Sequence, residues 1–464
     1  MGGVLPLDPA PDDLRALGAA ALAYAVAFLE GRGDALAAGE EGGLEAARRH
    51  RGAPPDHGGA FSDLLALVDD VQRYANDNAG PGFLAYIPGG GLFASSLADL
   101  LATTIDRYVS LWSESPVGAQ IEDNVVRWLC GLVGFGPAAR GTLTSGGSLA
   151  NLAAVVTARR ARLGEDFLDG TLYVSEQAHR SVEKAARIAG IPTANLRVVP
   201  TTPDLRMDVD ALVAAIAADR AAGRRPFLVS ASAGTTNTGA VDPLPAIADV
   251  CAEAGAWFHV DAAYGGFFLL TDRGRAAFTG IERADSVTLD PHKGLFLPYG
   301  TGAIVVRDGA LLRDAHHAGT AAYLQDLAGE GELPNASEYS SELSRDFRGL
   351  RVWFPLWLHG VGAFRAALDE KLDLARFLDA ELRTIPELEL PWRPELSVVP
   401  FRLRDGDDAA NRALLSRINA SQRVFLSSTV LAGRVTLRAA ILSHRTHRDR
   451  IEECVAIVRS AVAR

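Results

Sequence analysis

The sequence predicts an α/β fold, with a mostly parallel sheet in a large domain and a small α+β domain after it. From about residue 141, short and nearly continuous apolar runs alternate with Ala-rich helical segments. This alternation is typical of a parallel sheet covered by helices on both faces. After about residue 350 the pattern is helical, then strand-like, and a last helix begins at Arg448. A chain of 464 residues is also too long for one compact core.

The expected strands follow directly from these apolar runs. In the small domain they are LSVVPFRL (396–403) and RVTLRAAIL (434–442). In the large domain, helices are expected at 182–189 and 209–222. Because ligands bind at the carboxyl ends of parallel strands, we expect the chemistry just after each run. The runs of the large sheet are TLYVS (171–175), LRVVP (196–200), FLVSASAG (227–234), WFHVDAA (257–263), SVTLD (286–290) and GAIVVRD (302–308).

The pattern divides the chain into an N-terminal helical docking segment with its linker (1–85), a large domain (86–350) and a small domain (351–464). The apolar run from Gly18 to Leu29 ends at Glu30, which is too short for a membrane span. Two aspartates before it are typical of a helix start. We therefore expect an amphipathic docking helix there, and a linker over the Gly- and Ala-rich residues 31–60.

The composition excludes several classes of function. The formal net charge is −11 and no block of Lys and Arg stands out, so nucleic acid is not an expected partner. The three cysteines lie far apart, which predicts neither disulfides nor a zinc site, and no metal site is expected. With no signal-peptide pattern at the N-terminus, we expect a cytoplasmic protein with no membrane partner.

Two motifs at strand ends point to an aldehyde cofactor. In ADSVTLDPHKGLF, Lys293 follows a strand and is enclosed by apolar residues, where a lysine can form an imine with an aldehyde. The alternative is a surface lysine. In WFHVDAAYGG, Asp261 ends a buried run, and a buried carboxylate needs a partner. The protonated pyridine nitrogen of pyridoxal 5'-phosphate (PLP) would be such a partner, whereas the alternative is an Asp that caps the next turn.

Two further motifs are weaker when each is taken alone. GTLTSGGSLANL places a Ser/Gly turn before a helix, which makes an anion site from Gly146, Gly147 and Ser148, although such a turn is often only a helix cap. It matches neither the Walker pattern nor the dinucleotide fingerprint. His179 in VSEQAHRSVEKA can stack on a flat ring or can be a core histidine. SASAGTTNTGAVDPL adds Thr235, Thr236 and Asp242 after another strand.

Together these motifs resemble the group II PLP-dependent decarboxylases, of which aromatic-L-amino-acid decarboxylase and glutamate decarboxylase are typical. The similarity runs from about Phe83 to the C-terminus. HVDAAY and PHK resemble the cofactor motifs of the family almost letter for letter, and SEQAH-SVEKA resembles its stacking-histidine helix. FLAYIP, SPVGAQIEDNVVRWL, DFRGLRVWF and VTLRAAI match landmarks outside the cofactor site. The resemblance implies the fold of the aspartate aminotransferase superfamily, with PLP bound in the large domain.

The resemblance also implies roles for single residues. Lys293 would carry PLP as a Schiff base, Asp261 would pair with the pyridine nitrogen, and His179 would stack on the ring. The enzyme would be a homodimer with shared active sites and an amino-acid substrate. Other implied cofactor contacts are Gly146, Gly147, Ser148 and His292 at the phosphate, Ala263 under the ring, Thr235 or Thr236 at the 3'-oxygen, and Asp242 nearby. The implied substrate contacts are Tyr86, Ile87, Pro88 and Trp112.

The chain departs from the family pattern at three places. Asp290 stands where the family often has Asn, and we expect it to point away from the phosphate because two anions repel each other. Gly89 stands where members that act on aromatic substrates often have a larger residue. The protonating tyrosine of the family lies on a loop before DFRGL, and the candidates here are Tyr339 and, second, Tyr323.

The predicted reaction is decarboxylation of an L-amino acid to its amine and carbon dioxide, with Lys293, His179 and Tyr339 as catalytic residues. FLAYIP and Trp112 favour an aromatic side chain, while glycines 89–91 and Ser110 leave room for another substrate. An aldehyde-forming oxidative decarboxylase and an aminotransferase stay open as alternatives. An inactive scaffold is the alternative outside enzymes.

Overall fold

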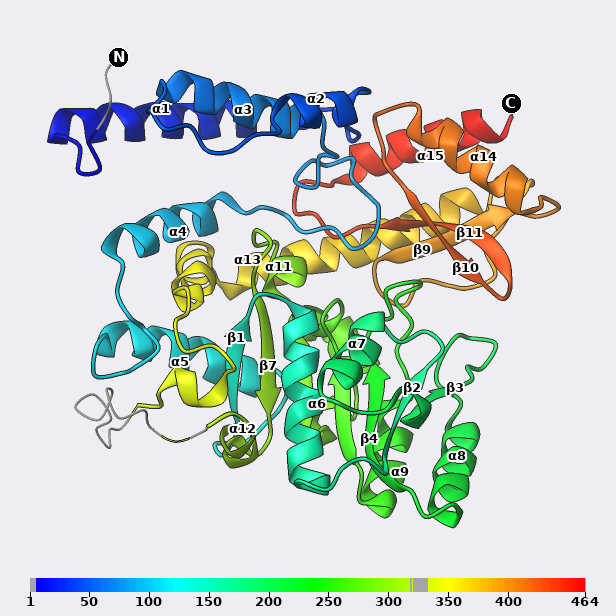
Figure 1. The fold of residues 1–464 in the computed structure, drawn as a ribbon. Coiled ribbons are helices and arrows are strands. Elements are labelled where there is room, and N and C mark those ends of the chain that lie inside the picture. The colour runs from blue at the N-terminus through cyan, green and yellow to red at the C-terminus, as the bar shows by residue number, and fades with distance from the viewer. Residues whose placement is uncertain (1–5, 318, 320–332, 464) are drawn as a thin grey trace.

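The computed structural model describes residues 6–317, 319 and 333–463. Within these residues a large sheet has the strand order β1-β7-β6-β5-β4-β2-β3 (Figure 1). The four pairs β2–β3, β2–β4, β4–β5 and β5–β6 are parallel, whereas β7 runs antiparallel to both of its neighbours. The strands are β1 Arg140–Thr144, β2 Gly170–Ser175, β3 Leu196–Val199, β4 Arg225–Ser232, β5 Trp257–Asp261, β6 Ser286–Leu289 and β7 Gly302–Val306.

Helices cover both faces of this sheet, which explains why the inner strands are buried at nearly every position and rich in apolar residues. In β7, Ile304 and Val306 pack on the side of α6, while Ala303 and Val305 belong to the core on the other side. The helices of the first face are α6 Gly147–Leu163, α7 Arg180–Ile188 and α12 Gly309–His316. Those of the second face are α5 Pro116–Leu132, α8 Val209–Ala221 and α9 Leu244–Ala254.

A smaller antiparallel sheet, ordered β10-β11-β9-β8 in the described part of the chain, forms the second unit. Its core packs against α13, α14 and α15. The long helix α13 joins the two units and is interrupted at Gly360, whose φ of 72° is not helical. The elements are α13 Arg348–Leu382, β8 Leu388–Glu389, β9 Val398–Leu403, α14 Asp408–Asn419, β10 Ser427–Leu431, β11 Arg434–Ala440 and α15 Arg448–Val462.

Short elements complete the chain. The helix α11 (Pro291–Gly294) lies in the reversal between β6 and β7, and α10 (Asp272–Ala277) follows the 3₁₀ turn Gly266–Leu270. Another 3₁₀ turn, Ala336–Tyr339, precedes α13, and α4 (Phe93–Ile105) packs on α13.

The N-terminal helices form an arm beside the main body (Figure 1). They are α1 (Pro11–Glu30), α2 (Gly43–Arg49) and α3 (Phe61–Arg73). Both α1 and α3 are fully described, and neither has a buried residue. By length and composition alone, Pro11–Gly33 is apolar enough to cross a membrane, with a mean hydropathy of 1.4.

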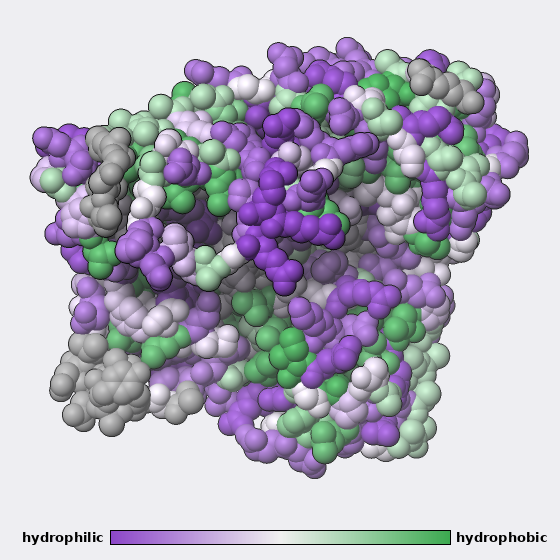
Figure 2. All heavy atoms as spheres, turned by 45° about the horizontal axis from the view of Figure 1, so that its top comes forward, coloured by the Kyte–Doolittle hydropathy of each residue, from purple (hydrophilic) through white to green (hydrophobic). Residues whose placement is uncertain are grey.

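Figure 2 brings the top of Figure 1 forward and shows the face that carries the arm. Hydrophobic side chains are exposed at several places on this face, and the face is hollowed near its middle.

The predicted fold class is confirmed. Each of the six strands expected in the large sheet is present, and the expected helices at 182–189 and 209–222 are α7 and α8. The two strand-like runs of the small domain are β9 and β11, and the last helix begins at Arg448 as predicted. Three strands, β1, β8 and β10, were not predicted.

The small sheet offers a test of its packing. Phe401 on β9 is fully buried in this core, so Phe401→Ala should cost about 3–5 kcal/mol of unfolding free energy through lost burial and a residual cavity. The measurement is the urea midpoint, followed by circular dichroism. Val430 lies exposed on β10 of the same sheet, and Val430→Ala should change the free energy by about 0.5 kcal/mol or less. Equal midpoints for the two variants would contradict this packing.

Candidate active site

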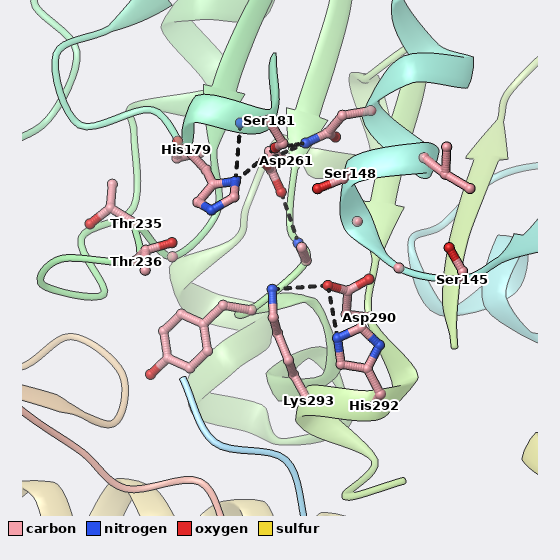
Figure 3. A pocket seen from close by; sticks show the side chains of 18 residues that line it. Ser145, Ser148, His179, Ser181, Thr235, Thr236, Asp261, Asp290, His292 and Lys293 are labelled. Atoms are coloured by element: carbon pink, nitrogen blue, oxygen red, sulfur yellow. Dashed lines mark hydrogen bonds and ion pairs between the residues drawn. The ribbon is translucent and has the colours of Figure 1, made fainter. Parts of the chain in front are cut away.

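A cavity of about 350 Å³ lies at the carboxyl ends of the parallel strands (Figure 3). It is the place that the sheet topology predicts for a ligand. Ten of the predicted site residues line it together, although they are spread over nearly 150 positions of the chain. They are Gly146, Gly147, Ser148, His179, Thr235, Thr236, Asp261, Ala263, His292 and Lys293.

Lys293 reaches into this cavity from α11, in the reversal between β6 and β7. His292 anchors the reversal, because its Nδ1 donates to the carbonyl of Thr301 at 2.6 Å. The Lys293 ammonium pairs with Asp290 at 2.9 Å. Burial acts to lower the pKa of Lys293, but the nearby carboxylates of Asp290 and Asp261 outweigh it, and the pKa is raised. Lys293 is therefore held as an ammonium that must lose a proton before it can act as a nucleophile.

Asp290, which we expect to point away from the phosphate, is part of the cavity lining. It lines the cavity because Lys293 supplies the opposite charge that a buried carboxylate needs. Its Oδ1 atom is buried and has no hydrogen-bond partner in the described chain. The His292 imidazole lies 3.6 Å away, and burial lowers its pKa.

Asp261 ends β5 and is buried. Its Oδ1 accepts from the backbone N–H of Ala263 at 3.1 Å, and its Oδ2 accepts from the Asn151 side-chain amide at 2.9 Å. Both partners are donors, so each carboxylate oxygen accepts a hydrogen bond. A carboxylate held in this way can pair with a protonated ring nitrogen.

His179 is the N-cap of α7, and its Nδ1 accepts from the backbone N–H of Ser181. The other ring nitrogen points away from Ser181, toward the open cavity (Figure 3). Thr235 and Thr236 lie on the wall beside it, in the loop after β4. The imidazole and Asp261 therefore face the same space, one from the N-cap of α7 and the other from the end of β5.

The Ser/Gly turn forms the start of α6, whose free N–H groups and dipole favour an anion. A Cβ atom at Gly147 would lie 2.9 Å from Asp290 Oδ2 and 3.1 Å from the Cβ of Ala263, so only glycine fits there without displacement. Ser148 adds a hydroxyl at the same end. A helix N-terminus, an amine and a paired carboxylate in one cavity match the phosphate, aldehyde and pyridine nitrogen of PLP.

Asp242 and Tyr339 lie outside the lining of this cavity. The Asp242 carboxylate accepts the backbone N–H groups of Met207 and Ser232, and burial raises its pKa to about 6. It supports a loop and does not face the cavity. Tyr339 lines a separate small cavity with Glu122, so the described chain does not bring its hydroxyl to Lys293. Tyr323 lies outside the described residues.

The predicted substrate residues are also not part of the lining in the single chain. Tyr86 is 60% exposed and has a φ of 53°, which non-glycine residues rarely adopt. Ile87 is buried, and Pro88 follows it in the chain. The backbone N–H of Trp112 donates to the side-chain oxygen of Asn335. A larger residue does not fit at Gly89 or Gly90 without displacement: a Cβ atom would lie 2.7 Å from the His292 carbonyl and 2.4 Å from His444 Nδ1, respectively.

Sequence reasoning missed three residues that support this site. Asn151 and Ser181 line the cavity and bind Asp261 and His179. Asn151 lies four residues after Gly147, which places it on the same helix face, and this spacing was the available signal. Arg438 on β11 donates to the carbonyls of Tyr86 and Thr236, and burial lowers its pKa to about 10.

Comparison with known proteins agrees with this geometry. Residues 55–404 match the pyridoxal-dependent decarboxylase conserved domain. The chain is 36% identical over 402 residues to aromatic-L-amino-acid decarboxylase of Bacillus atrophaeus, covering 84% of this chain and 83% of that protein. It is 30% identical over 423 residues to tryptophan decarboxylase 1 of Oryza sativa, covering 84% and 82%. The crystal structure of Oryza sativa TDC with PLP and tryptamine superposes with a TM-score of 0.93 at 26% identity over 99% of both chains.

This chain therefore belongs to the group II pyridoxal-dependent decarboxylases, and it is a PLP-dependent amino-acid decarboxylase, a carboxy-lyase. The resemblance expected from its motifs is confirmed. The residues present fit the cofactor that the family uses.

The pairing of Lys293 with Asp290 predicts a pH dependence of cofactor attachment. Only the neutral amine attacks the aldehyde, and Asp290 raises the pKa of Lys293, so attachment to the native chain should speed up as pH rises. Asp290→Asn removes that charge, and the midpoint of attachment should move to lower pH. Borohydride trapping followed by mass spectrometry at each pH measures it. Asp210→Asn, at an exposed position of α8, is the control, and an unchanged or higher midpoint for Asp290→Asn would refute the pairing.

Proposed function

We propose that this decarboxylase acts on an aromatic L-amino acid and releases the corresponding arylalkylamine and carbon dioxide. The observation that carries the proposal is the charge of the cavity. Among the described residues that line it, Lys293 is the only lysine and there is no arginine. An acidic substrate side chain would therefore have no free cation to pair with, because Lys293 is committed to the cofactor. The relatives named above, an aromatic-L-amino-acid and a tryptophan decarboxylase, support the same substrate class.

Lys293, Asp261, His179 and the N-terminus of α6 with Ser148 each have a task in this proposal. PLP, when bound, supplies an electron-poor ring that takes up the electron pair left behind as carbon dioxide departs. Lys293 attaches the cofactor and later releases the amine product. Asp261 keeps a proton at the pyridine nitrogen, and the N-terminus of α6 holds the phosphate with Ser148. His179 covers one side of the ring position and excludes water from it.

The proton that replaces the carboxylate at Cα needs a donor. We propose that it comes from the chain before α13, where the sequence places Tyr323 and Tyr339. In one chain Tyr339 lies at a separate cavity, so this role requires a second subunit or a movement of the segment. Simple decarboxylation rather than an oxidative variant depends on this proton arriving before oxygen does.

The test is mass spectrometry of the products when PLP-loaded protein meets a panel of aromatic, acidic and diamino L-amino acids. Arylalkylamines are the expected products. Amines from acidic or diamino acids alone would contradict the substrate class. Aldehydes that require oxygen, or keto acids, would instead contradict simple decarboxylation.

Lys293→Ala should reduce amine formation by about a thousandfold or more, because the nucleophile that attaches the cofactor is gone. Lys184→Ala, at an exposed position of α7, is the matched control and should leave the rate unchanged. Product formation under saturating PLP is the measurement. A Lys293→Ala variant that keeps the native rate would remove Lys293 from the mechanism.

We also propose that the protein is a homodimer that buries its N-terminal arm. Four apolar residues of α3 recur at the spacing of one helix face, and they are between 41% and 63% exposed. Monomeric proteins rarely expose such a continuous apolar stripe, so a second copy of the chain is a suitable cover for it. This apolar stripe consists of Leu64, Leu67, Val68 and Val71.

The cytoplasmic location expected from the sequence stays a prediction.

The double variant Leu64→Glu/Val71→Glu tests the dimer, because two charges in the stripe oppose its burial. Sedimentation equilibrium at micromolar concentration should show a dimer for the native chain and a monomer for the variant. Ser62→Glu, on the opposite side of the same exposed helix, should stay dimeric. A native chain that is monomeric, or that binds anionic vesicles through the arm, would contradict the proposal.

A further inference from the structure

A continuous chain of buried hydrogen bonds lies behind the cavity and converges on Asn151. This residue is on the cavity side of α6 and is only 1% exposed. Its amide nitrogen lies 2.9 Å from Asp261 Oδ2 and 2.8 Å from Ser181 Oγ. Its amide oxygen lies 3.1 Å from His259 Nε2 and 2.7 Å from Thr288 Oγ1. The amide thus has four partners, which is its full hydrogen-bonding capacity.

The orientation of this amide follows from its partners. A carboxylate only accepts hydrogen bonds, so the atom facing Asp261 must be the nitrogen. The oxygen then faces His259, whose Nε2 must carry a proton. Burial lowers the pKa of His259 to about 4, so its ring is neutral at neutral pH and its Nδ1 is an acceptor. That acceptor is 2.8 Å from Ser286 Oγ, which itself accepts from the Trp257 indole N–H at 2.8 Å.

The same reasoning fixes the protonation of His179. Ser181 Oγ accepts from Asn151, so its own proton is free to go to His179 Nδ1, 2.7 Å away. The backbone N–H of Ser181 also points at this nitrogen, and a backbone N–H only donates. Nδ1 is therefore the unprotonated nitrogen. The proton of the neutral ring lies on Nε2, the nitrogen that faces the cavity (Figure 3).

We propose that Asn151 is a positioning residue for the cofactor site, whose amide ties the Asp261 carboxylate to the His179 imidazole. It holds Asp261 as an anion that accepts and His179 as the tautomer with its proton on Nε2. The inference rests on the proposed roles of these two residues and extends them to a residue that does not need to touch the cofactor.

Only an amide meets all these conditions at this position. Aspartate has the same shape but would place a second carboxylate beside Asp261 and offer no proton to Ser181. Ser181 would then donate to the new carboxylate and leave His179 Nδ1 with the backbone N–H alone. Alanine would remove one hydrogen bond from each of four buried polar side chains.

The experiment uses the full chain and two readouts that do not depend on turnover. The first is the PLP dissociation constant from absorbance titration. Asn151→Asp and Asn151→Ala should each weaken binding by about ten- to a hundredfold, the range for hydrogen bonds to charged groups. The second is the ¹⁵N signal of His179 in histidine-labelled protein, assigned through its loss in His179→Gln. Both variants should shift this signal, because Asn151 no longer holds the Ser181 hydroxyl as the donor to His179 Nδ1.

Thr157→Val is the matched control, because its hydroxyl is buried on the same helix but donates to the Ala153 carbonyl, away from the cavity. It should leave both readouts unchanged. Melting curves without PLP show whether each variant folds. If Asn151→Asp does not fold, the two readouts of Asn151→Ala test the proposal. PLP affinity within about twofold of native, together with an unchanged His179 signal, would overturn the proposal. A native chain that does not bind PLP would instead contradict the proposed function.

Discussion

The burial of the Asp261 carboxylate is the constraint on which the rest of the site depends. A lone buried charge costs roughly several kcal/mol, so the fold must surround it with hydrogen-bond donors. The turn after β5 supplies the Ala263 N–H, and α6 supplies Asn151. This requirement fixes the rotation of α6 about its axis, because its Asn must face the sheet. It therefore also fixes where the helix N-terminus and its glycines point.

Much of the fold was readable because burial on both faces leaves a strong signal. The strands β2, β4 and β5 are buried at nearly every position and rich in apolar residues, and each was predicted. The missed strands lack that signal: β1 reads RGTLT and β10 reads SSTVL, and β10 is half exposed at an edge of its sheet. Composition also does not indicate the direction of a strand. The sequence GAIVV of β7 therefore predicts a strand but not whether it is parallel or antiparallel to its neighbours.

The site was predictable to the extent that its residues follow strand ends. Of the ten predicted residues that meet in one cavity, seven follow β2, β4, β5 or β6, whereas Gly146, Gly147 and Ser148 were predicted from the Ser/Gly turn before a helix. Asp242 also follows a strand, but its carboxylate turns back to the backbone, a choice that depends on the path of the loop around Met207. Asn151 stands in an Ala-rich helix, where only the three-dimensional neighbourhood reveals its partners. The placement of Tyr339 depends on how the segment before α13 packs, which no local pattern encodes.

The antiparallel sense of β7 has a consequence for how firmly the enzyme keeps its cofactor. Leu289 and Ala303 are paired across β6 and β7, so the chain between them is a short reversal tied at both ends. Within the reversal, the backbone N–H of Lys293 donates to the Asp290 carbonyl and that of His292 to the Thr301 carbonyl, which hold the Lys293 backbone in place. If Lys293 holds PLP as proposed, recapture of the cofactor after each product would be an intramolecular reaction, with an effective amine concentration far above that of any amine in solution. The tether would then favour retention over exchange, and one molecule of cofactor would serve through many turnovers.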